Sequence, residues 1–315
     1  MTLVIPEAGP AMRAPRLPRR RVDGVLLLDK PPGLTSNVAL QRAKRLFRAE
    51  KAGHTGTLDP AATGLIALCF GEATKFSAGL LDGDKVYEAL VKLGVTTTTA
   101  DSEGEVLAVR PVHTDVGEVA AALRRFQGRI RQTPPMHSAI KLAGRPLYTY
   151  AREGVEVKRE AREVEIYALT LVGFAGDELR LDVHCSKGTY IRTLAEDIGG
   201  VLGCGAHLAG LRRTAVGPFR VEQAVGLEAL EAMPEHRVLD CLLPADVLVS
   251  GLPPIVLGAQ QARRMLHGQP VMTEEDRAPG PVRLYDEDGG FLGVGDVVPG
   301  GMVNPRRLLA LDPGN

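Results

Sequence analysis

The stretch Gly53–Gly64 (GHTGTLDPAATG) combines turn-forming residues with side chains that could carry chemistry. Its turn-forming residues are Gly53, Gly56, Pro60 and Gly64, and they surround His54 and Asp59. Glycine and proline at this density fix a loop, and rigid loops often hold functional groups. An aspartate before a proline is driven towards an extended conformation and is commonly a turn residue. The spacing alone therefore leaves Asp59 either structural or catalytic, and His54 either a packed or a binding histidine.

A second candidate stretch, Cys185–Thr193 (CSKGTYIRT), joins a predicted strand to a predicted helix. It places Tyr190 and Arg192 at the helix start, where the helix dipole disfavours a cation. Such a residue is expected where the side chain has another task, such as pairing with a carboxylate; a surface arginine is the alternative. Tyr87 opens a further predicted strand, where a tyrosine usually serves packing.

The third candidate is an insert at residues 132–157, with a Pro-Pro pair, apolar and aromatic residues, and basic residues on both sides. Residues 121–162 carry ten basic side chains against three acidic ones. A basic and partly aromatic segment suits contact with phosphates and bases. An ordinary solvated loop is the alternative.

Strands and helices are expected to alternate irregularly around these stretches. Strands are predicted at Gly24–Asp29, Glu163–Phe174 and Glu178–Cys185, with helices from a Ser36 cap to about Arg48 and over Ile191–Leu202. Without a regular βαβ rhythm, the pattern favours an α+β fold over a doubly wound α/β fold.

The 315 residues suggest about two domains. A boundary is predicted near Ser250–Pro254, followed by a mostly β module at residues 251–315. That module has a helix at Ala259–Leu266 and strands at Val282–Tyr285, Phe291–Val298 and Leu308–Leu311. Residues 1–21 carry five arginines against one glutamate and are interpreted as a disordered basic tail, which leaves residues 22–250 for the main domain.

Several function classes are disfavoured by the composition. The sequence has no run of about 18 apolar residues, so no membrane span is expected. None of its four cysteines forms a CxxC pair, and no His/Cys cluster has metal-ligand spacing. The sequence also lacks the GxGxxG, Walker A, HExxH and GxSxG motifs. We expect no metal, no nucleotide cofactor, no signal peptide and a reducing, cytoplasmic location.

Taken together, the motifs resemble those of the TruB family, the stand-alone bacterial tRNA pseudouridine-55 synthases. The resemblance covers about residues 22–312 and leaves out the basic tail. Its motifs, in family order, are GVLLLDKPPGLTS (24–36), GHTGTLDPAATG (53–64), GEATKFS (71–77), DKVYEA (84–89), HCSKGTYIRTLAEDIG (184–199) and GCGAHLAGLRRTAVG (203–217).

The resemblance implies an α+β catalytic domain around a mixed, mainly antiparallel sheet, followed by a small β-rich PUA-like domain. It implies isomerisation of uridine 55 in the TΨC loop of tRNA to pseudouridine, with no cofactor. Asp59 matches the catalytic aspartate, which would attack either C6 of the base or C1′ of the sugar. Arg192 matches its arginine partner, and we expect this guanidinium to reverse the rise in the Asp59 pKa that burial causes.

The remaining site residues also come from the resemblance. Tyr190 matches an active-site tyrosine near C5, and Tyr87 matches the tyrosine that stacks on the flipped base. Leu211 matches an apolar pocket residue, and His54 matches the histidine that helps to hold the target loop open. Lys30 and Asp101 match polar residues that support the catalytic loop.

The partners follow in the same way. The insert 132–157 corresponds to a thumb-like loop that closes on the TΨC arm, and we expect a monomer that needs no guide RNA and no obligate protein partner. Two alternatives remain open. One is an RNA-folding chaperone with the same fold, and the other is a guide-RNA-dependent synthase that acts inside a ribonucleoprotein.

Overall fold

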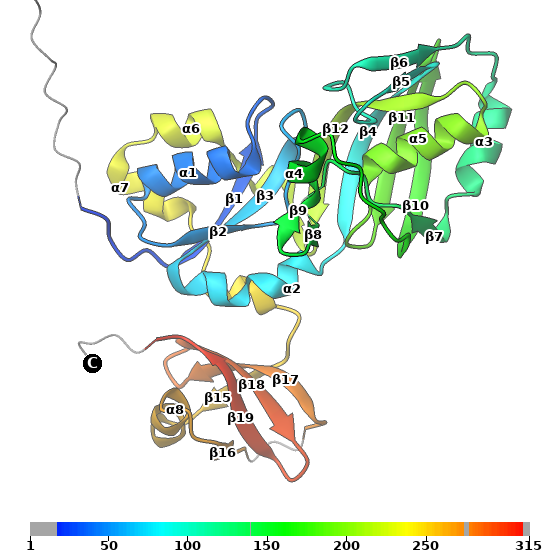
Figure 1. Ribbon diagram of the computed structural model, residues 1–315. Helices are drawn as coiled ribbons and strands as arrows, with labels where there is room; N and C mark the ends of the chain where they lie inside the picture. Colours follow the sequence, from blue (N-terminus) through cyan, green and yellow to red (C-terminus); the bar gives the residue numbers. More distant parts are fainter. Residues whose placement is uncertain (1–17, 139, 274–276, 311–315) are drawn as a thin grey trace, which may run out of the picture.

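The computed structural model describes residues 18–138, 140–273 and 277–310. A ten-stranded mixed sheet forms its larger part (Figure 1). The strands of this sheet are β1 (Gly24–Lys30), β2 (Ala52–Thr55), β3 (Thr63–Phe70), β4 (Lys85–Leu93), β7 (Gly128–Gln132), β10 (Arg162–Ala175), β11 (Glu178–Cys185), β12 (Ala206–Val216), β13 (Phe219–Arg220) and β14 (Val225–Gly226).

The order of this sheet is β14-β1-β3-β12-β4-β11-β10-β7, with β2 beside β3 and β13 beside β12. Within this sheet, as far as the structure describes it, only the β1–β14 and β3–β12 pairs are parallel. The predicted mixed, mainly antiparallel α+β sheet is therefore confirmed. Two hairpins lie outside it, β5 (Val95–Thr97) with β6 (Val106–Val109), and β8 (Lys141–Leu142) with β9 (Arg145–Pro146).

Helices cover the two halves of the sheet separately (Figure 1). Beside β1 lie α1 (Ser36–Leu46) and α6 (Leu227–Ala232), whereas α3 (Val116–Arg124) and α5 (Ile191–Val201) lie beside β10, β4 and β12. The other helical segments are η1 (Gly71–Phe76), α2 (Ser77–Leu81), α4 (Leu147–Arg152), η2 (Val221–Gln223), α7 (Glu235–Val238), η3 (Leu239–Cys241) and η4 (Ala245–Val249). No helix in the described ranges is long and apolar enough to cross a membrane.

The start of α1 differs from the prediction in one residue. Thr35 is the N-cap, and its hydroxyl accepts a hydrogen bond from the Val38 N–H at 3.1 Å. Ser36 was predicted to be the cap, but its buried hydroxyl contacts the backbone of Leu58 instead. The difference matters because this contact reaches the loop that holds Asp59.

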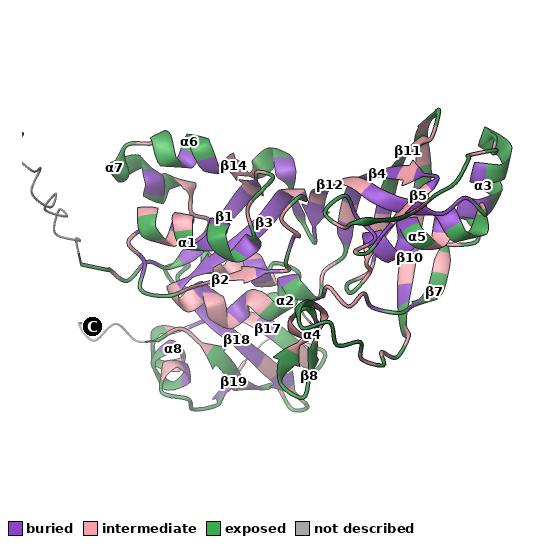
Figure 2. Ribbon diagram, turned by 45° about the horizontal axis from the view of Figure 1, so that its top comes forward, coloured by how far each residue is buried: buried purple, intermediate pink, exposed green. Residues whose placement is uncertain are grey.

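The residues of β1 and β3 are almost all buried (Figure 2). Their side chains alternate between two hydrophobic clusters, one on each face of the sheet. One face packs on α1, where the rings of Phe47 and Phe70 lie 4.8 Å apart. The opposite face packs on η1, α2 and η4. Apolar layers on both sides fix the register of these strands, because a slip of one residue would exchange the two faces.

The C-terminal part forms a separate five-stranded sheet in the order β15-β17-β18-β19-β16. Its elements are β15 (Pro254–Leu257), α8 (Ala259–Leu266), β16 (Val271–Met272), β17 (Gly280–Asp286), β18 (Phe291–Val298) and β19 (Met302–Leu308). The last strand was predicted too late in the chain, at Leu308–Leu311, because the polar MVNPRRL segment shows no clear alternation. Residue 311 lies outside the described residues.

The smaller sheet packs against η1 and η4 of the larger part. The rings of Phe76 and Phe291 are 5.2 Å apart, and the Lys75 ammonium donates to the Leu308 carbonyl at 2.9 Å. At the other end, most of the predicted tail 1–21 lies outside the described residues. Arg20 is already paired with the chain at Arg48 and Glu50, so ordered structure begins before residue 22.

Candidate active site

The loop that carries Asp59 is tied to the β1–α1 connection on one side. The Ser36 hydroxyl accepts from the Leu58 N–H at 2.8 Å and lies 2.9 Å from the Leu58 carbonyl. The Pro60 carbonyl accepts from the Gly33 N–H at 2.9 Å. These contacts hold the residues on both sides of Asp59 and so fix its backbone.

Lys30 supports the same loop from a fully buried position. Its ammonium donates to three carbonyls at 2.7–3.1 Å, those of Pro31, Leu34 and Pro60. Burial lowers the Lys30 pKa to about 8, which the carboxylates of Asp59 and Glu103 partly oppose. Lys30 therefore remains mostly protonated at neutral pH and holds the loop through three hydrogen bonds.

Arg192 meets Asp59 where α5 begins. The Arg192 Nε atom lies 3.1 Å from Asp59 Oδ2, and Nη1 lies 3.4 Å from Asp101 Oδ2. The guanidinium also donates to the carbonyls of His137, at 2.7 Å, and Thr99, at 3.4 Å. The Arg192 side chain is 6% exposed, whereas that of Asp59 is 41% exposed, so the carboxylate has an open side. The predicted ion pair is thus present.

The pKa of Asp59 remains above its ordinary value, contrary to the expectation that Arg192 would reverse the rise. Burial is the largest cause, and the neighbouring Asp101 carboxylate adds to it. Arg192 opposes both, but it divides its guanidinium between the two carboxylates. Asp59 is therefore a carboxylate with raised basicity held beside a cation, which suits both nucleophilic attack and proton transfer.

Tyr190 stands at the start of the same helix. It is the N-cap residue of α5, and its half-buried side chain lies near the Ser138 hydroxyl. Burial raises the pKa of its phenol. The Ser138 Oγ atom is buried and has no hydrogen-bond partner within the described residues, so this corner of the site retains an unsatisfied polar group.

Tyr87 lies inside the protein on β4, beside the guanidinium of Arg213. Arg213 is 1% exposed and has no carboxylate within ion-pair distance in the part of the chain that the structure describes. It donates to the Leu65 carbonyl at 2.8 Å and to the Gly56 carbonyl at 3.1 Å. This buried cation links β3 to the turn that precedes Asp59.

His54 and Leu211 complete the predicted set. His54 lies on β2, and its buried Nδ1 atom has no hydrogen-bond partner among the residues that the structure describes. Burial together with Arg213 lowers the pKa of this histidine. Leu211 lies on β12 and lines a recess of about 20 Å³ together with Asp59, Asp101 and Arg192. The structure therefore brings Asp59, Arg192, Asp101 and Leu211 around one recess.

Sequence analysis did not single out Arg213, Gln132 or His137. A role for Arg213 could have been suspected, because it is a charged residue inside a largely apolar strand. His137 acts through its backbone carbonyl, which no side-chain pattern can reveal. Gln132 contacts the backbone of Tyr190, and its role depends on a strand edge that the sequence did not define.

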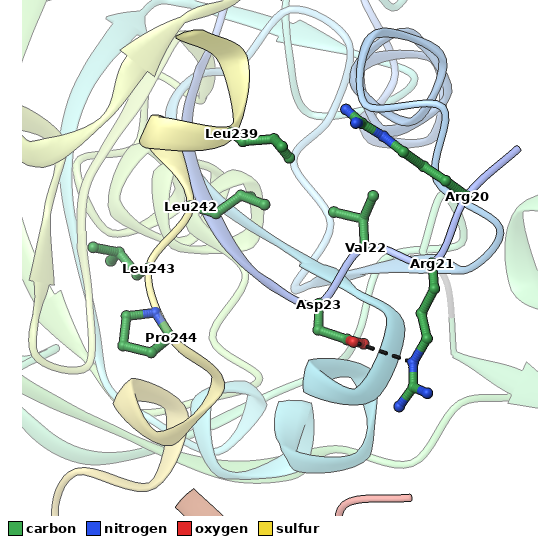
Figure 3. A pocket seen from close by; sticks show the side chains of 8 residues that line it. All are labelled: Arg20, Arg21, Val22, Asp23, Leu239, Leu242, Leu243 and Pro244. Carbon is green, nitrogen blue, oxygen red and sulfur yellow. Dashed lines mark ion pairs between the residues drawn. The ribbon is translucent and has the colours of Figure 1, made fainter. Parts of the chain in front are cut away.

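A larger hollow of about 480 Å³ lies elsewhere, between residues 20–23 and 239–244 (Figure 3). Its walls are Val22, three leucines and a proline, and Arg21 and Asp23 form an ion pair at its edge. It contains none of the predicted site residues. No cluster of three or more potential metal ligands occurs among the described residues.

Family models match the chain in three consecutive segments. The TruB family pseudouridylate synthase N-terminal domain matches residues 44–191, the tRNA pseudouridylate synthase B C-terminal domain matches residues 192–250, and the pseudouridine synthase II TruB C-terminal model matches residues 253–309. A tRNA pseudouridine synthase B from Aromatoleum aromaticum is 56% identical over 292 residues, covering 93% of this chain and 94% of the relative. The chain belongs to the TruB family. It is accordingly a pseudouridine synthase, an isomerase.

Other TruB relatives and solved structures agree with this assignment. A tRNA pseudouridine synthase B from Cupriavidus metallidurans is 54% identical, covering 96% of this chain and 98% of the relative. A crystal structure of a Cbf5-Nop10-Gar1 complex gives a TM-score of 0.67 at 26% identity, covering 90% of this chain and 84% of that chain. An archaeal box H/ACA sRNP Nop10-Cbf5 complex gives the same TM-score at 25% identity, covering 92% of this chain and 87% of that chain.

Proposed function

We propose that this TruB-family chain converts uridine 55 in the TΨC loop of tRNA to pseudouridine, with Asp59 as the nucleophile and without a cofactor. The observation that carries the proposal is the Asp59–Arg192 pair at 3.1 Å, on a loop tied down by Ser36 and Lys30. The relatives named tRNA pseudouridine synthase B support the choice of tRNA.

The reaction exchanges the N1–C1′ bond for a C5–C1′ bond; C5 loses a proton and N1 gains one, so the product is an isomer of the substrate. The Asp59 carboxylate attacks either C6 or C1′, and its raised pKa makes it a stronger base and nucleophile than an exposed aspartate. Arg192 holds the carboxylate in place and balances its charge in a site that is largely buried. Tyr190 would assist proton transfer or pack on the base.

The target base must leave its stack to reach Asp59, at a cost of a few kcal/mol. The recess at Asp59 is small, about 20 Å³, and the base would approach from the open side of the carboxylate, whose side chain is 41% exposed. Tyr87 would then stack on the flipped base, which contributes about 1–3 kcal/mol. His54 would help to hold the target loop open.

Tritium release from tRNA labelled at C5 of uridine tests the reaction and the nucleophile together. We expect release by the wild-type protein and none by Asp59→Asn, with tRNA binding retained in both. The exposed residue Asp240, which pairs with Arg237, provides the control Asp240→Asn, with release like the wild type. Release by Asp59→Asn would exclude Asp59 as the nucleophile. Tight binding without release by the wild type would favour the RNA-chaperone alternative.

The same assay on a bare tRNA transcript tests independence from a guide RNA. The Cbf5 structures similar to this chain were solved in complexes with Nop10, one of them also with Gar1. We expect release from the transcript with no added RNA or protein, because the chain carries its own basic insert at residues 132–157. Release that requires an added RNA or protein would contradict stand-alone action.

A further inference from the structure

Gln132 makes an unusual contact at the point where the insert leaves the sheet. It is the last residue of β7, is 2% exposed, and its side chain faces the backbone of Tyr190. The carboxamide oxygen accepts from the Tyr190 N–H at 3.0 Å, and the carboxamide nitrogen donates to the Tyr190 carbonyl at 3.3 Å. Only an amide side chain offers both a donor and an acceptor in this arrangement.

This contact satisfies one backbone N–H at the start of a helix that has no side-chain cap among the described residues. Within the described residues, α5 begins at Ile191 without a side-chain cap, so the N–H of its N-cap residue Tyr190 depends on Gln132. An N-terminal backbone group without a partner is costly when buried. Gln132 therefore satisfies the start of α5 and also fixes its position.

A second attachment lies five residues further along the insert. The His137 carbonyl accepts from the Arg192 guanidinium at 2.7 Å, the shortest of that guanidinium's hydrogen bonds and ion pairs. Residues 132–137 thus hold both the helix start and the arginine that follows it two positions later. The insert and the Asp59–Arg192 pair are joined through these two contacts.

We infer that Gln132 is a positioning residue. Its carboxamide holds the start of α5 so that Arg192 reaches Asp59, and Gln132 thereby links the Asp59–Arg192 pair to the basic insert. The inference rests on the proposed function for its consequence in catalysis, but its geometric core can be measured without turnover. An error of about 1 Å in placing a reacting group can reduce a rate about 100-fold.

The first test substitutes the amide by an apolar chain of similar volume, in Gln132→Met. We expect the single-turnover rate of C5 tritium release to fall by up to about 100-fold, with tRNA affinity unchanged. The ionisation of Asp59 is followed by ¹³C NMR of aspartate-labelled protein, with Asp59→Asn for assignment. Loss of the Arg192 contact should raise the pKa of Asp59, because Arg192 lowers it. The other charged groups that face Asp59 are Asp101, Lys30 and His137.

Two further variants make the outcome decisive. Gln127 is exposed just before β7, so Gln127→Met is the matched control and should leave rate and pKa unchanged. Gln132→Glu still accepts from the Tyr190 N–H but cannot donate to its carbonyl, so we expect a shift in the same direction. A folded Gln132 variant whose rate and Asp59 pKa are those of the wild type would overturn the inference. Failure of both Gln132 variants to fold would also overturn it, because Gln132 would then be a structural residue. Absence of release by the wild type would contradict the proposed function, while the NMR shift would still decide the role of Gln132.

Discussion

At the scale of single residues, the site depends on one guanidinium that serves two carboxylates. Arg192 contacts Asp59 through Nε and Asp101 through Nη1. Of these two carboxylates, only that of Asp59 has an open side. Asp101 is held further by Thr99 and by the Glu103 N–H. Its fixed negative charge raises the pKa of Asp59 and offsets part of what Arg192 contributes.

Removing the charge of Asp101 should extend activity to lower pH. In Asp101→Asn the carboxylate that raises the Asp59 pKa is gone, while Arg192 still lowers it. Asp59 must be ionised to attack, so a lower pKa moves the acid limb of the single-turnover rate to lower pH. Asp82→Asn, at an exposed residue paired with Lys187, is the control and should not move that limb. An acid limb that stays in place or moves upward would show that Asp101 acts through geometry and not through charge.

At the scale of elements, the close approach of β3 and β12 places Arg213 beside the turn that precedes Asp59. Gly64 pairs in parallel register with Arg213, and its backbone has φ of +100°. A Cβ atom on Gly64 would lie 2.3 Å from the Arg213 carbonyl oxygen. Only glycine permits both this conformation and this approach.

Gly64→Ala should therefore destabilise the protein by about 2–4 kcal/mol, from backbone strain and steric overlap together. The measurement is urea unfolding followed by circular dichroism. Gly53→Ala, on the adjacent β2, is the control, because a Cβ there meets no atom within 4 Å and the backbone has no positive φ. Equal stability of the two variants would disprove the importance of the β3–β12 approach.

Sequence reasoning succeeded where a local pattern specifies an element. The helix at Ala259–Leu266 and the strand at Phe291–Val298 were predicted from local residue patterns, and both are present. It missed β3 and β12 as separate strands, because strands buried on both faces lose the polar alternation that marks them. The direction of the Asp59 pKa shift was also missed, because it depends on burial in the folded protein and on Asp101, which is 42 positions away in the chain.

At the scale of the whole molecule, positive charge is concentrated on one segment. Residues 121–162 hold ten basic and three acidic side chains, whereas residues 251–315 hold six and eight. Within the C-terminal sheet, Arg306 pairs with Asp296 and Arg307 donates to the Lys75 carbonyl. These arginines serve internal contacts, which leaves the insert as the main candidate for phosphate binding.

Within the insert, β8, β9 and α4 form a compact unit that presents this charge. The guanidinium of Arg145 lies 4.8 Å from the centre of the Tyr150 ring, and that of Arg152 lies 5.4 Å from the centre of the Tyr148 ring. Stacked guanidinium and aromatic groups can contact phosphates and bases at once. The same unit is joined to Arg192 through residues 132–137, so RNA bound there would also affect the Asp59–Arg192 pair.

Replacing the exposed insert residues Lys141, Arg145 and Arg152 by serine should weaken tRNA binding and flatten its salt dependence. Each lost phosphate contact means that about one counterion fewer is released on binding. The plot of log K against log salt should therefore become less steep, by up to about three units of slope. The control replaces three exposed basic residues outside the insert, Arg45, Lys51 and Arg220. Filter binding over a range of salt concentrations measures both slopes. If the plot becomes less steep by the same amount in both triple variants, phosphate is bound by a diffuse positive surface. If the slope of the insert variant is unchanged, its three replaced side chains do not contact phosphate.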